Sequence, residues 1–216
     1  MIRPMLAMGA LLFASTLPPA CHAQSAEPAA SVASAVPDEI RQQLPAAPEG
    51  FSWRMHKNAV FLQPNDWVVR QVDVSGAELP SSTYATSPGE FSVQRPFETG
   101  LTVQIFSGSM RLKQLEAKKL AMAYLQPLLA SHSKADIRKL DQAQRGDFER
   151  TWFQYRDAPE GKRPVIVHKY VMANNVTDTV HVFTFETPEE RWEADWARFG
   201  HPIMSKVAVL PTVSPR

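Results

Sequence analysis

The sequence has almost no cysteine: of its 216 residues, only Cys21 is one. Cys21 lies just ahead of a predicted cleavage site after Ala23. If cleavage follows Ala23, the mature chain has no cysteine, which excludes disulfides, thiolate metal sites and a cysteine nucleophile. The fold must then rest on packing alone.

The chain also lacks a long hydrophobic run and a surplus of charge. Its apolar run, Met5 to Leu17, is shorter than the roughly 20 residues that cross a bilayer. The full chain has 23 basic and 22 acidic side chains, and removing Arg3 with the first 23 residues leaves 22 of each. A nucleic-acid surface needs a basic surplus on one face, so none is predicted.

No motif specifies a reaction. The sequence contains no Gly-x-Ser-x-Gly, no His-Glu-x-x-His and no glycine loop that would cradle a phosphate. A Ser-x-x-Lys at residues 131–134 lacks the companion motifs of penicillin-binding enzymes. We therefore predict no catalytic residue and no cofactor.

The amino terminus has the pattern of a secretory signal peptide. Arg3 supplies a positive charge, Met5 to Leu17 form the apolar region, and Cys21-His22-Ala23 places small residues where signal peptidase reads. We expect residues 1–23 to be removed and the protein to be periplasmic or secreted, in a Gram-negative bacterium. A lipid anchor at Cys21 is the alternative, but Pro18-Pro19-Ala20 departs from the usual lipoprotein pattern, so no anchor is expected.

Composition divides the rest of the chain into three parts. Residues 24–48 are rich in Ala, Ser, Pro and Gln, which predicts a flexible leader. Residues 49–210 predict a single domain, long enough for a sizeable core. Residues 211–216 predict a loose tail.

Short runs rich in aromatic and β-branched side chains predict four strands in the first half, at 51–55, 59–62, 68–74 and 101–106. Residues 76–100 carry many Ser, Thr, Pro and Gly side chains and predict a long excursion with at most one short strand near Phe91. Such a loop is a candidate recognition element.

Helical spacing follows at residues 112–129. One side of this predicted helix carries the apolar residues Leu112, Leu115, Met122, Leu125 and Leu129. We expect that side to pack on a sheet and Pro127 to kink or end the helix.

After a linker, residues 148–157, 165–173 and 176–186 predict three more strands. Asn174-Asn175 tolerate the positive φ of a tight hairpin, so the last two strands should be antiparallel neighbours.

A final helix is predicted to begin with Thr187 as its N-cap, and Trp192 and Trp196 should face inward at i, i+4 spacing. The apolar segment 203–210 predicts an edge segment that returns to the sheet. The tryptophans fit a core better than the alternative of a ligand groove or a partner hot spot.

Several short cues accompany this order of elements. They are Phe51-Ser52-Trp53, the Pro-x-x-Trp within Phe61 to Trp67, Phe97 to Val103, and Arg191-Trp192. Together they resemble the PsbP-like fold group, over roughly residues 50–210. That group includes the extrinsic PsbP protein of photosystem II, a yeast Ran-binding import factor and bacterial chaperones for secreted effectors.

The resemblance implies an α+β fold in which helices flank a central antiparallel sheet on both faces, an α/β/α sandwich. It also implies action by binding other proteins, without a shared catalytic centre to assign to this chain. The sequence has no chloroplast-type transit segment, so a photosystem role is not expected.

His168 and His181 form a candidate metal pair. If Asn174-Asn175 make a two-residue turn, His168 lies directly opposite His181 on one sheet face. Two imidazoles could hold a divalent metal or sense pH, although no third ligand accompanies them. The alternative is an apolar sheet face packed under a helix, and a turn longer by two residues would pair His181 with Tyr170 instead.

Two functional hypotheses follow. The first is a non-catalytic exported binding or accessory protein, such as an immunity or assembly factor, that holds a protein partner at a sheet edge or at the 76–100 excursion. The second is a metal-binding protein or enzyme that uses His168 and His181.

Overall fold

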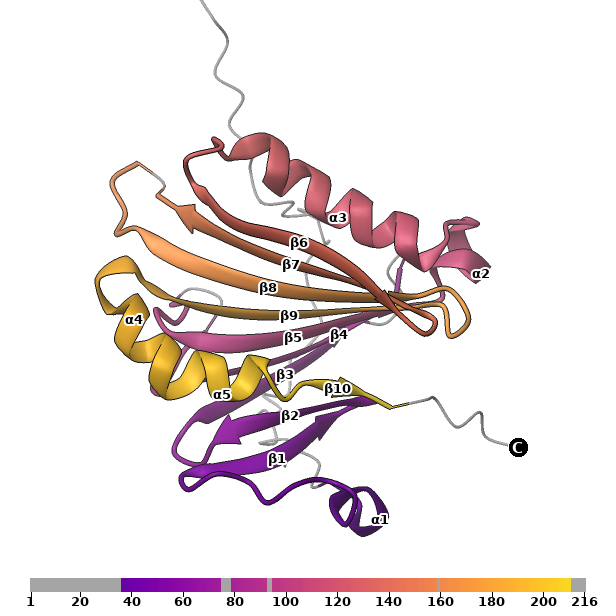
Figure 1. Ribbon diagram of the computed structural model, residues 1–216, viewed down its shortest axis with the longest axis horizontal. Coiled ribbons are helices and arrows are strands. Elements are labelled where there is room, and N and C mark those ends of the chain that lie inside the picture. The colour runs from indigo at the N-terminus through magenta and orange to yellow at the C-terminus, as the bar shows by residue number, and fades with distance from the viewer. Residues whose placement is uncertain (1–35, 75–78, 93–94, 159, 211–216) are drawn as a thin grey trace, which may run out of the picture. The chain divides into compact units, whose positions relative to one another are not determined.

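A seven-stranded antiparallel sheet forms the centre of the computed structural model, which describes residues 36–74, 79–92, 95–158 and 160–210. The strand order is β3-β4-β5-β9-β8-β7-β6 (Figure 1). The strands are β3 (Val68–Val74), β4 (Ser81–Ser87), β5 (Gly100–Ser107), β6 (Ile137–Arg145), β7 (Phe148–Asp157), β8 (Val165–Asn174) and β9 (Thr179–Pro188). The α+β class and the antiparallel sheet are thus confirmed.

A second, smaller sheet has the order β1-β2-β10. It consists of β1 (Phe51–His56), β2 (Ala59–Pro64) and β10 (Ala208–Val209). Both pairings are antiparallel. The central strand β2 thus joins β1, from the start of the domain, to β10, from its end. The sequence did not predict a separate sheet.

Few helices accompany the sheets. They are α1 (Asp38–Arg41), α2 (Ser109–Lys113), α3 (Ala117–Ser131), α4 (Trp192–Asp195) and α5 (His201–Met204). A 3₁₀ turn at Glu189–Arg191 precedes α4, and a π-helical turn at Trp196–Gly200 joins α4 to α5. Within the described ranges, no helix is long and apolar enough to span a membrane.

Alternation along β8 divides the buried side chains into two clusters. Ile166, Tyr170 and Met172 belong to a cluster with β1, β2 and residues 189–210, which we call the C-terminal segment. Val167 and Val171 belong to a cluster with α3. Successive side chains of a strand point to opposite faces, so the two clusters occupy opposite faces of the sheet. This explains why β8 reads as a nearly continuous apolar run.

The predicted helix over 112–129 is two helices. Gln114 has a left-handed φ of 54° and separates α2 from α3, which changes the helical phase. The buried face of α3 therefore carries Ala117, Ala121 and Leu125, while Met122 is exposed.

Pro127 lies inside α3, which continues to Ser131, so the helix does not end at this proline, one of the two outcomes expected there. Leu125, Leu128 and Leu129 pack against the sheet on both sides of Pro127. That packing outweighs the one backbone donor that proline removes.

Two strands were missed. β4 lies between β3 and β5, inside the predicted excursion, so the expectation of a long excursion with at most one short strand near Phe91 was wrong. Its buried residues Ser82, Tyr84 and Thr86 are largely small and polar, which resembles loop composition. β6 replaces the predicted linker and is an edge strand whose side chains are almost all exposed and largely polar, a pattern typical of protected edges.

The C-terminal segment keeps the predicted tryptophan pair. The rings of Trp192 and Trp196 stack at 4.9 Å, and Trp192 is buried, which confirms the inward orientation. The predicted helix start was wrong, because β9 includes Thr187 and Pro188 caps the 3₁₀ turn. The edge segment does return to a sheet, but as β10 beside β2.

Part of the predicted leader lies within the described residues. Val36 is only 2% exposed, and Asp38–Arg41 form α1. The indole of Trp53 on β1 donates a hydrogen bond to the carbonyl of Pro45 at 2.8 Å. The leader's remaining residues and the predicted signal peptide lie outside the described residues.

Candidate functional site

A groove lies between strands β6, β7 and β8 of the main sheet and the C-terminal segment. Its volume is about 540 Å³, a size typical of ligand sites. The sheet side is formed by Arg145, Phe148, Arg150, Trp152, Tyr170 and Met172, and the other side by Met204, Ser205, Val207, Ala208 and Val209. We call this the arginine–aromatic groove.

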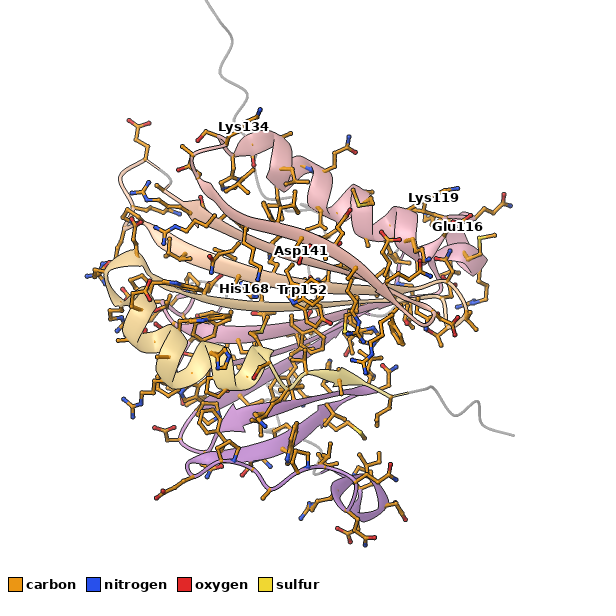
Figure 2. All side chains as sticks on the ribbon, in the orientation of Figure 1. Glu116, Lys119, Lys134, Asp141, Trp152 and His168 are labelled. Carbon is orange, nitrogen blue, oxygen red and sulfur yellow. The ribbon has the colours of Figure 1, made fainter. Side chains whose placement is uncertain are left out.

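The floor of the groove is an aromatic stack. Trp152 on β7 lies opposite Tyr170 on β8, and their rings stack at 4.8 Å with an interplanar angle of 13°. Figure 2 marks Trp152 on the sheet. Tyr170 is buried, whereas Trp152 is only half-buried, so the stack presents an aromatic surface to the groove.

Alternation along β7 produces this surface. Thr151, Phe153 and Tyr155 are buried on one face of the strand, while Arg150 and Trp152 point to the other face and are half-buried. Among the described residues β6 is an edge strand and pairs with β7, so this face lies near the edge of the sheet. The position of β7 therefore leaves Arg150 and Trp152 partly uncovered.

Two guanidinium groups give the groove its charge. No carboxylate lines the groove, and neither Arg145 nor Arg150 forms an ion pair within the described part of the chain. Arg150 Nε is shielded from solvent and has no hydrogen-bond partner among the described residues. Burial raises the pKa of Tyr170, and the positive charges of Arg150 and Arg145, together with a hydrogen bond from Arg150, oppose that shift.

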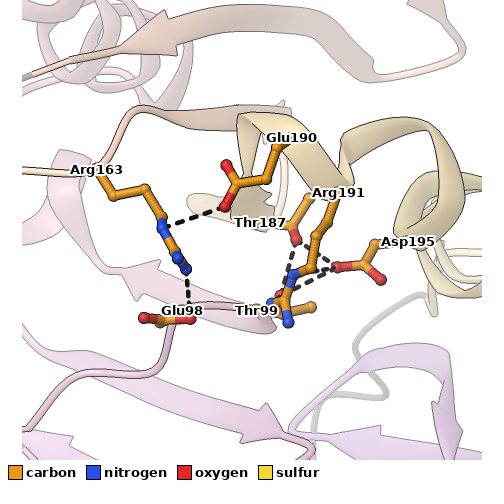
Figure 3. A network of polar contacts seen from close by, with 7 residues as sticks. All are labelled: Glu98, Thr99, Arg163, Thr187, Glu190, Arg191 and Asp195. Atoms are coloured by element: carbon orange, nitrogen blue, oxygen red, sulfur yellow. Dashed lines mark hydrogen bonds and ion pairs between the residues drawn. The ribbon is translucent and has the colours of Figure 1, made fainter.

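A polar network fixes the start of the C-terminal segment, whose later residues form one wall of the groove (Figure 3). Thr187 donates to Asp195 Oδ2 at 2.5 Å and lies 2.7 Å from the hydroxyl of Thr99. Arg191 also donates to Thr99. Thr99 and Thr187 are buried, where hydrogen bonds are costly to lose.

The exposed Arg163 adds two ion pairs to this network, to Glu98 at 3.2 Å and to Glu190 at 3.1 Å. Exposed pairs of this kind contribute little to stability. The hydroxyl and carboxylate contacts of Thr99, Thr187 and Asp195 therefore hold α4 against β9 and against the residue that precedes β5.

The predicted histidine pair does not form. His168 lies opposite Phe185, and His181 lies opposite Met172. The hairpin is longer than a two-residue turn, because Asn174 pairs with Thr179. The side-chain oxygen of Asn174 accepts hydrogen bonds from the amides of Val176 and Thr177, which stabilises the longer turn.

The two histidines are instead separate buried groups. His168, labelled in Figure 2, lies on the apolar face that was the alternative expectation. Its ring packs against that of Trp196 at 4.7 Å. His181 donates from Nε2 to Asn58 Oδ1 at 2.8 Å, because the Asn58 amide nitrogen donates to the carbonyl of Leu210. Burial lowers the pKa of each to about 4.

No group of three His, Cys, Asp or Glu side chains that could hold a metal ion occurs among the residues that the structure describes. His168 and His181 thus remain two separate positions, with no shared geometry for a ligand.

The 76–100 excursion is not a free recognition loop. Ser81–Ser87 form an interior strand of the main sheet, and Phe91 packs against Phe97 at 5.2 Å. The main sheet therefore has two open edges, β3 and β6, and neither lies in the middle of this segment.

Sequence reasoning named Trp152 only as one of several tryptophans and missed Arg145 and Arg150. The alternation of residues 148–152 could have placed Phe148, Arg150 and Trp152 on one face. The sequence contained no signal that β10 would form the opposite wall of the groove, because the two walls come from distant parts of the chain.

No protein-family model and no curated protein matches this sequence. Solved structures do match it. The solution structure of cyanobacterial PsbP (CyanoP) from Synechocystis is 16% identical, with a TM-score of 0.44 over 78% of this chain and 99% of that chain. The crystal structure of the Ran-binding protein Mog1p from Saccharomyces cerevisiae is 14% identical, with a TM-score of 0.40 over 70% of this chain and 90% of that chain.

A crystal structure from Bacteroides thetaiotaomicron is 10% identical, with a TM-score of 0.42 over 74% of this chain and 47% of that chain. This chain spans about half the length of that protein. At these identities and TM-scores the likeness concerns the fold alone and carries no information on activity. The chain is similar to PsbP-like and Mog1-like proteins, and the resemblance predicted from the sequence is confirmed at the level of fold.

Proposed function

We propose that this protein is a non-catalytic exported binding or accessory protein that holds a protein partner in the arginine–aromatic groove. The observation that carries the proposal is the partly open Trp152–Tyr170 stack, flanked by two arginines that form no ion pair among the described residues. Tryptophan, tyrosine and arginine are the residue types that most often dominate protein interfaces.

The groove is a better binding surface than the open edges of the main sheet. β6 exposes Arg138, Lys139 and Asp141, and charged side chains on an edge strand discourage pairing with another chain. β3 exposes Val72 and Arg70, without a neighbouring hollow among the pockets described. A second hollow of about 450 Å³ also contains aromatic and charged side chains, but there Glu49 and Asp66 accompany Arg198. Of the pockets described, the groove is the one that combines an aromatic stack with arginines and no carboxylate.

Export is part of the proposal. The signal-peptide pattern of residues 1–23 supports a periplasmic or secreted location, in which the chain folds without disulfides. A small exported domain with one binding surface fits the role of an immunity factor or of an assembly factor. The fold alone does not distinguish them.

We also infer an α/β/α sandwich for the main sheet. Two clusters of buried residues support this arrangement, one with α3 and one with Trp192, Ile203 and Met204 from the C-terminal helices.

Affinity capture from a periplasmic extract tests the proposed function. Residues 24–216 are immobilised as wild type, as Trp152→Ala and as Val72→Ala. We expect one protein to be retained by wild type and by Val72→Ala, and its recovery to fall at least about tenfold with Trp152→Ala, because that change removes a central aromatic anchor. Val72 is an exposed apolar residue on the far edge of the same sheet and is the matched control.

The unfolding midpoint of each variant is measured alongside, and Arg150→Gln, which keeps the stack, serves as a second groove variant. Equal retention by wild type and both groove variants, or loss with Val72→Ala alone, would contradict the proposal. So would recovery of no protein under several extraction conditions.

A further inference from the structure

The charge of the groove is unbalanced. Its lining contains two guanidinium groups and no carboxylate. The whole chain, in contrast, is close to neutral, with 23 basic and 22 acidic side chains. A positive charge concentrated in one hollow of a neutral protein indicates a ligand with negative charge at that place.

The guanidinium of Arg150 lacks one of its hydrogen-bond partners, as does that of Arg54 outside the groove. Arg150 Nε is buried from solvent and has no hydrogen-bond acceptor among the described residues. A buried donor without an acceptor is unfavourable, and a carboxylate oxygen satisfies a guanidinium with good geometry. Because Arg150 is only half-buried, a carboxylate in the groove would accept from its guanidinium, which otherwise donates to the hydroxyl of Tyr170.

The other wall of the groove includes an extended backbone segment beside Met204 and Ser205. Val207, Ala208 and Val209 line it, and Ala208–Val209 form β10. β10 pairs with β2 and has no second neighbour in the small sheet among the described residues. An open strand edge of this kind can accept one more strand through backbone hydrogen bonds.

We propose that the occupant of the groove is an extended acidic segment of the partner, which lies along β10 and places carboxylates on Arg145 and Arg150. This inference rests on the proposed function and specifies its ligand. Apolar side chains of the segment cover the Trp152–Tyr170 stack, which is the apolar part of the groove floor. Alternating acidic and apolar residues would suit a strand, since its side chains alternate in direction.

The chemistry of the lining distinguishes this occupant from other anions. A nucleic acid would require a basic stripe over a wider surface, and the chain has no basic surplus. A small free anion would satisfy Arg150 but would leave the aromatic stack and the edge of β10 uncovered. The peptide is the occupant that uses all three features.

Calorimetric titration with defined peptides tests the inference. The probe is an acetylated, amidated heptapeptide in which glutamate alternates with valine and phenylalanine, and its control has glutamine at every glutamate position. We expect the acidic peptide to bind wild-type protein at least about tenfold more tightly than its glutamine counterpart, because charge-assisted hydrogen bonds to arginine are stronger than neutral ones. This preference should shrink between about 20 mM and about 500 mM salt.

Arg150→Gln and Arg145→Gln should each reduce the preference for the acidic peptide, and Arg70→Gln should leave it unchanged. Arg70 is an exposed arginine on β3, at the opposite edge of the sheet. Equal affinity for the two peptides, or an unchanged preference in Arg150→Gln, would overturn the inference. Binding of free glutamate or benzoate as tightly as the peptide would also overturn it, in favour of a small anion.

The two proposals fail in different ways. If Trp152→Ala loses a captured partner but no acidic peptide binds, the acidic segment is wrong and partner binding at the groove stands. If the peptide binds through Arg150 but no partner is captured, the recognition chemistry stands and the proposed protein-binding function is wrong.

Discussion

Replacement of Phe185 by alanine should lower the free energy of unfolding by about 3–5 kcal/mol, as expected for a large-to-small change at a fully buried aromatic position. Phe185 is 0% exposed, and its ring lies 5.9 Å from that of Trp196 and 6.2 Å from that of Trp192. The local packing leaves little room to relax, since even a Cβ added at Gly200 would lie 2.9 Å from the Phe185 ring. The cavity should therefore persist.

Urea-induced unfolding, followed by circular dichroism, measures this loss. Val176→Ala is the control, because Val176 is 76% exposed in the β8–β9 turn and its truncation should change stability by less than about 0.5 kcal/mol. A loss below about 1 kcal/mol for Phe185→Ala would mean that the C-terminal segment does not pack on this face as described.

Acidification from pH 7 to pH 4 should destabilise the protein, chiefly through His168 and His181. Burial lowers the pKa of each from 6.5 in the unfolded chain to about 4 in the folded chain. Each neutral imidazole therefore contributes stability that is fully present above pH 6.5 and is lost as the pH falls through 4. Each of these differences in pKa corresponds to a loss of about 3 kcal/mol in the free energy of unfolding.

Glu186 partly offsets this loss. Burial raises the pKa of its carboxyl group, so its protonation in acid stabilises the folded state. The net direction still follows the two histidines, because both shifts are large and have the same sign.

The variant His168→Phe separates the contributions of the two histidines to this loss of stability. The His168 ring packs on Trp196, and its Nδ1 has no hydrogen-bond partner among the described residues, so phenylalanine should fit without an orphaned contact. We expect this variant to lose only about half as much stability between pH 7 and pH 4 as wild type. His201→Gln, at an exposed position, should behave as wild type, and an unchanged slope in His168→Phe would contradict the assignment.

The parts of the fold that depend on local pattern could be predicted from the sequence. Val165–Asn174 and Thr179–Pro188 are long runs of β-branched and aromatic residues, and their strand character was evident. The pairing of Trp192 with Trp196 was evident too, because i, i+4 spacing places both side chains on one side of a helix.

The parts that depend on tertiary contacts could not be predicted. Ser81–Ser87 reads as a loop, yet it forms an interior strand because its neighbours β3 and β5 satisfy its backbone and Tyr84 packs on Phe61. The register of β8 and β9 depends on a longer turn held by the side chain of Asn174, and this moved His168 and His181 apart.

The groove itself illustrates the same limit. Arg145, Arg150 and Trp152 lie within eight residues of one another in the sequence, but Val207 to Val209 come from the end of the domain. Charge and aromatic content gave no sign that these segments meet. Only the three-dimensional arrangement brings together, in one hollow, an aromatic stack, a strand edge and two arginines that form no ion pair among the described residues.

Hydrogen–deuterium exchange of the chain with and without its captured partner tests most directly whether the groove is the binding site. We predict slower backbone exchange on binding at Ala208–Val209 and at residues 148–152, with no change along β3. Slowing confined to β3 or α3, or no slowing in either wall of the groove, would contradict the account.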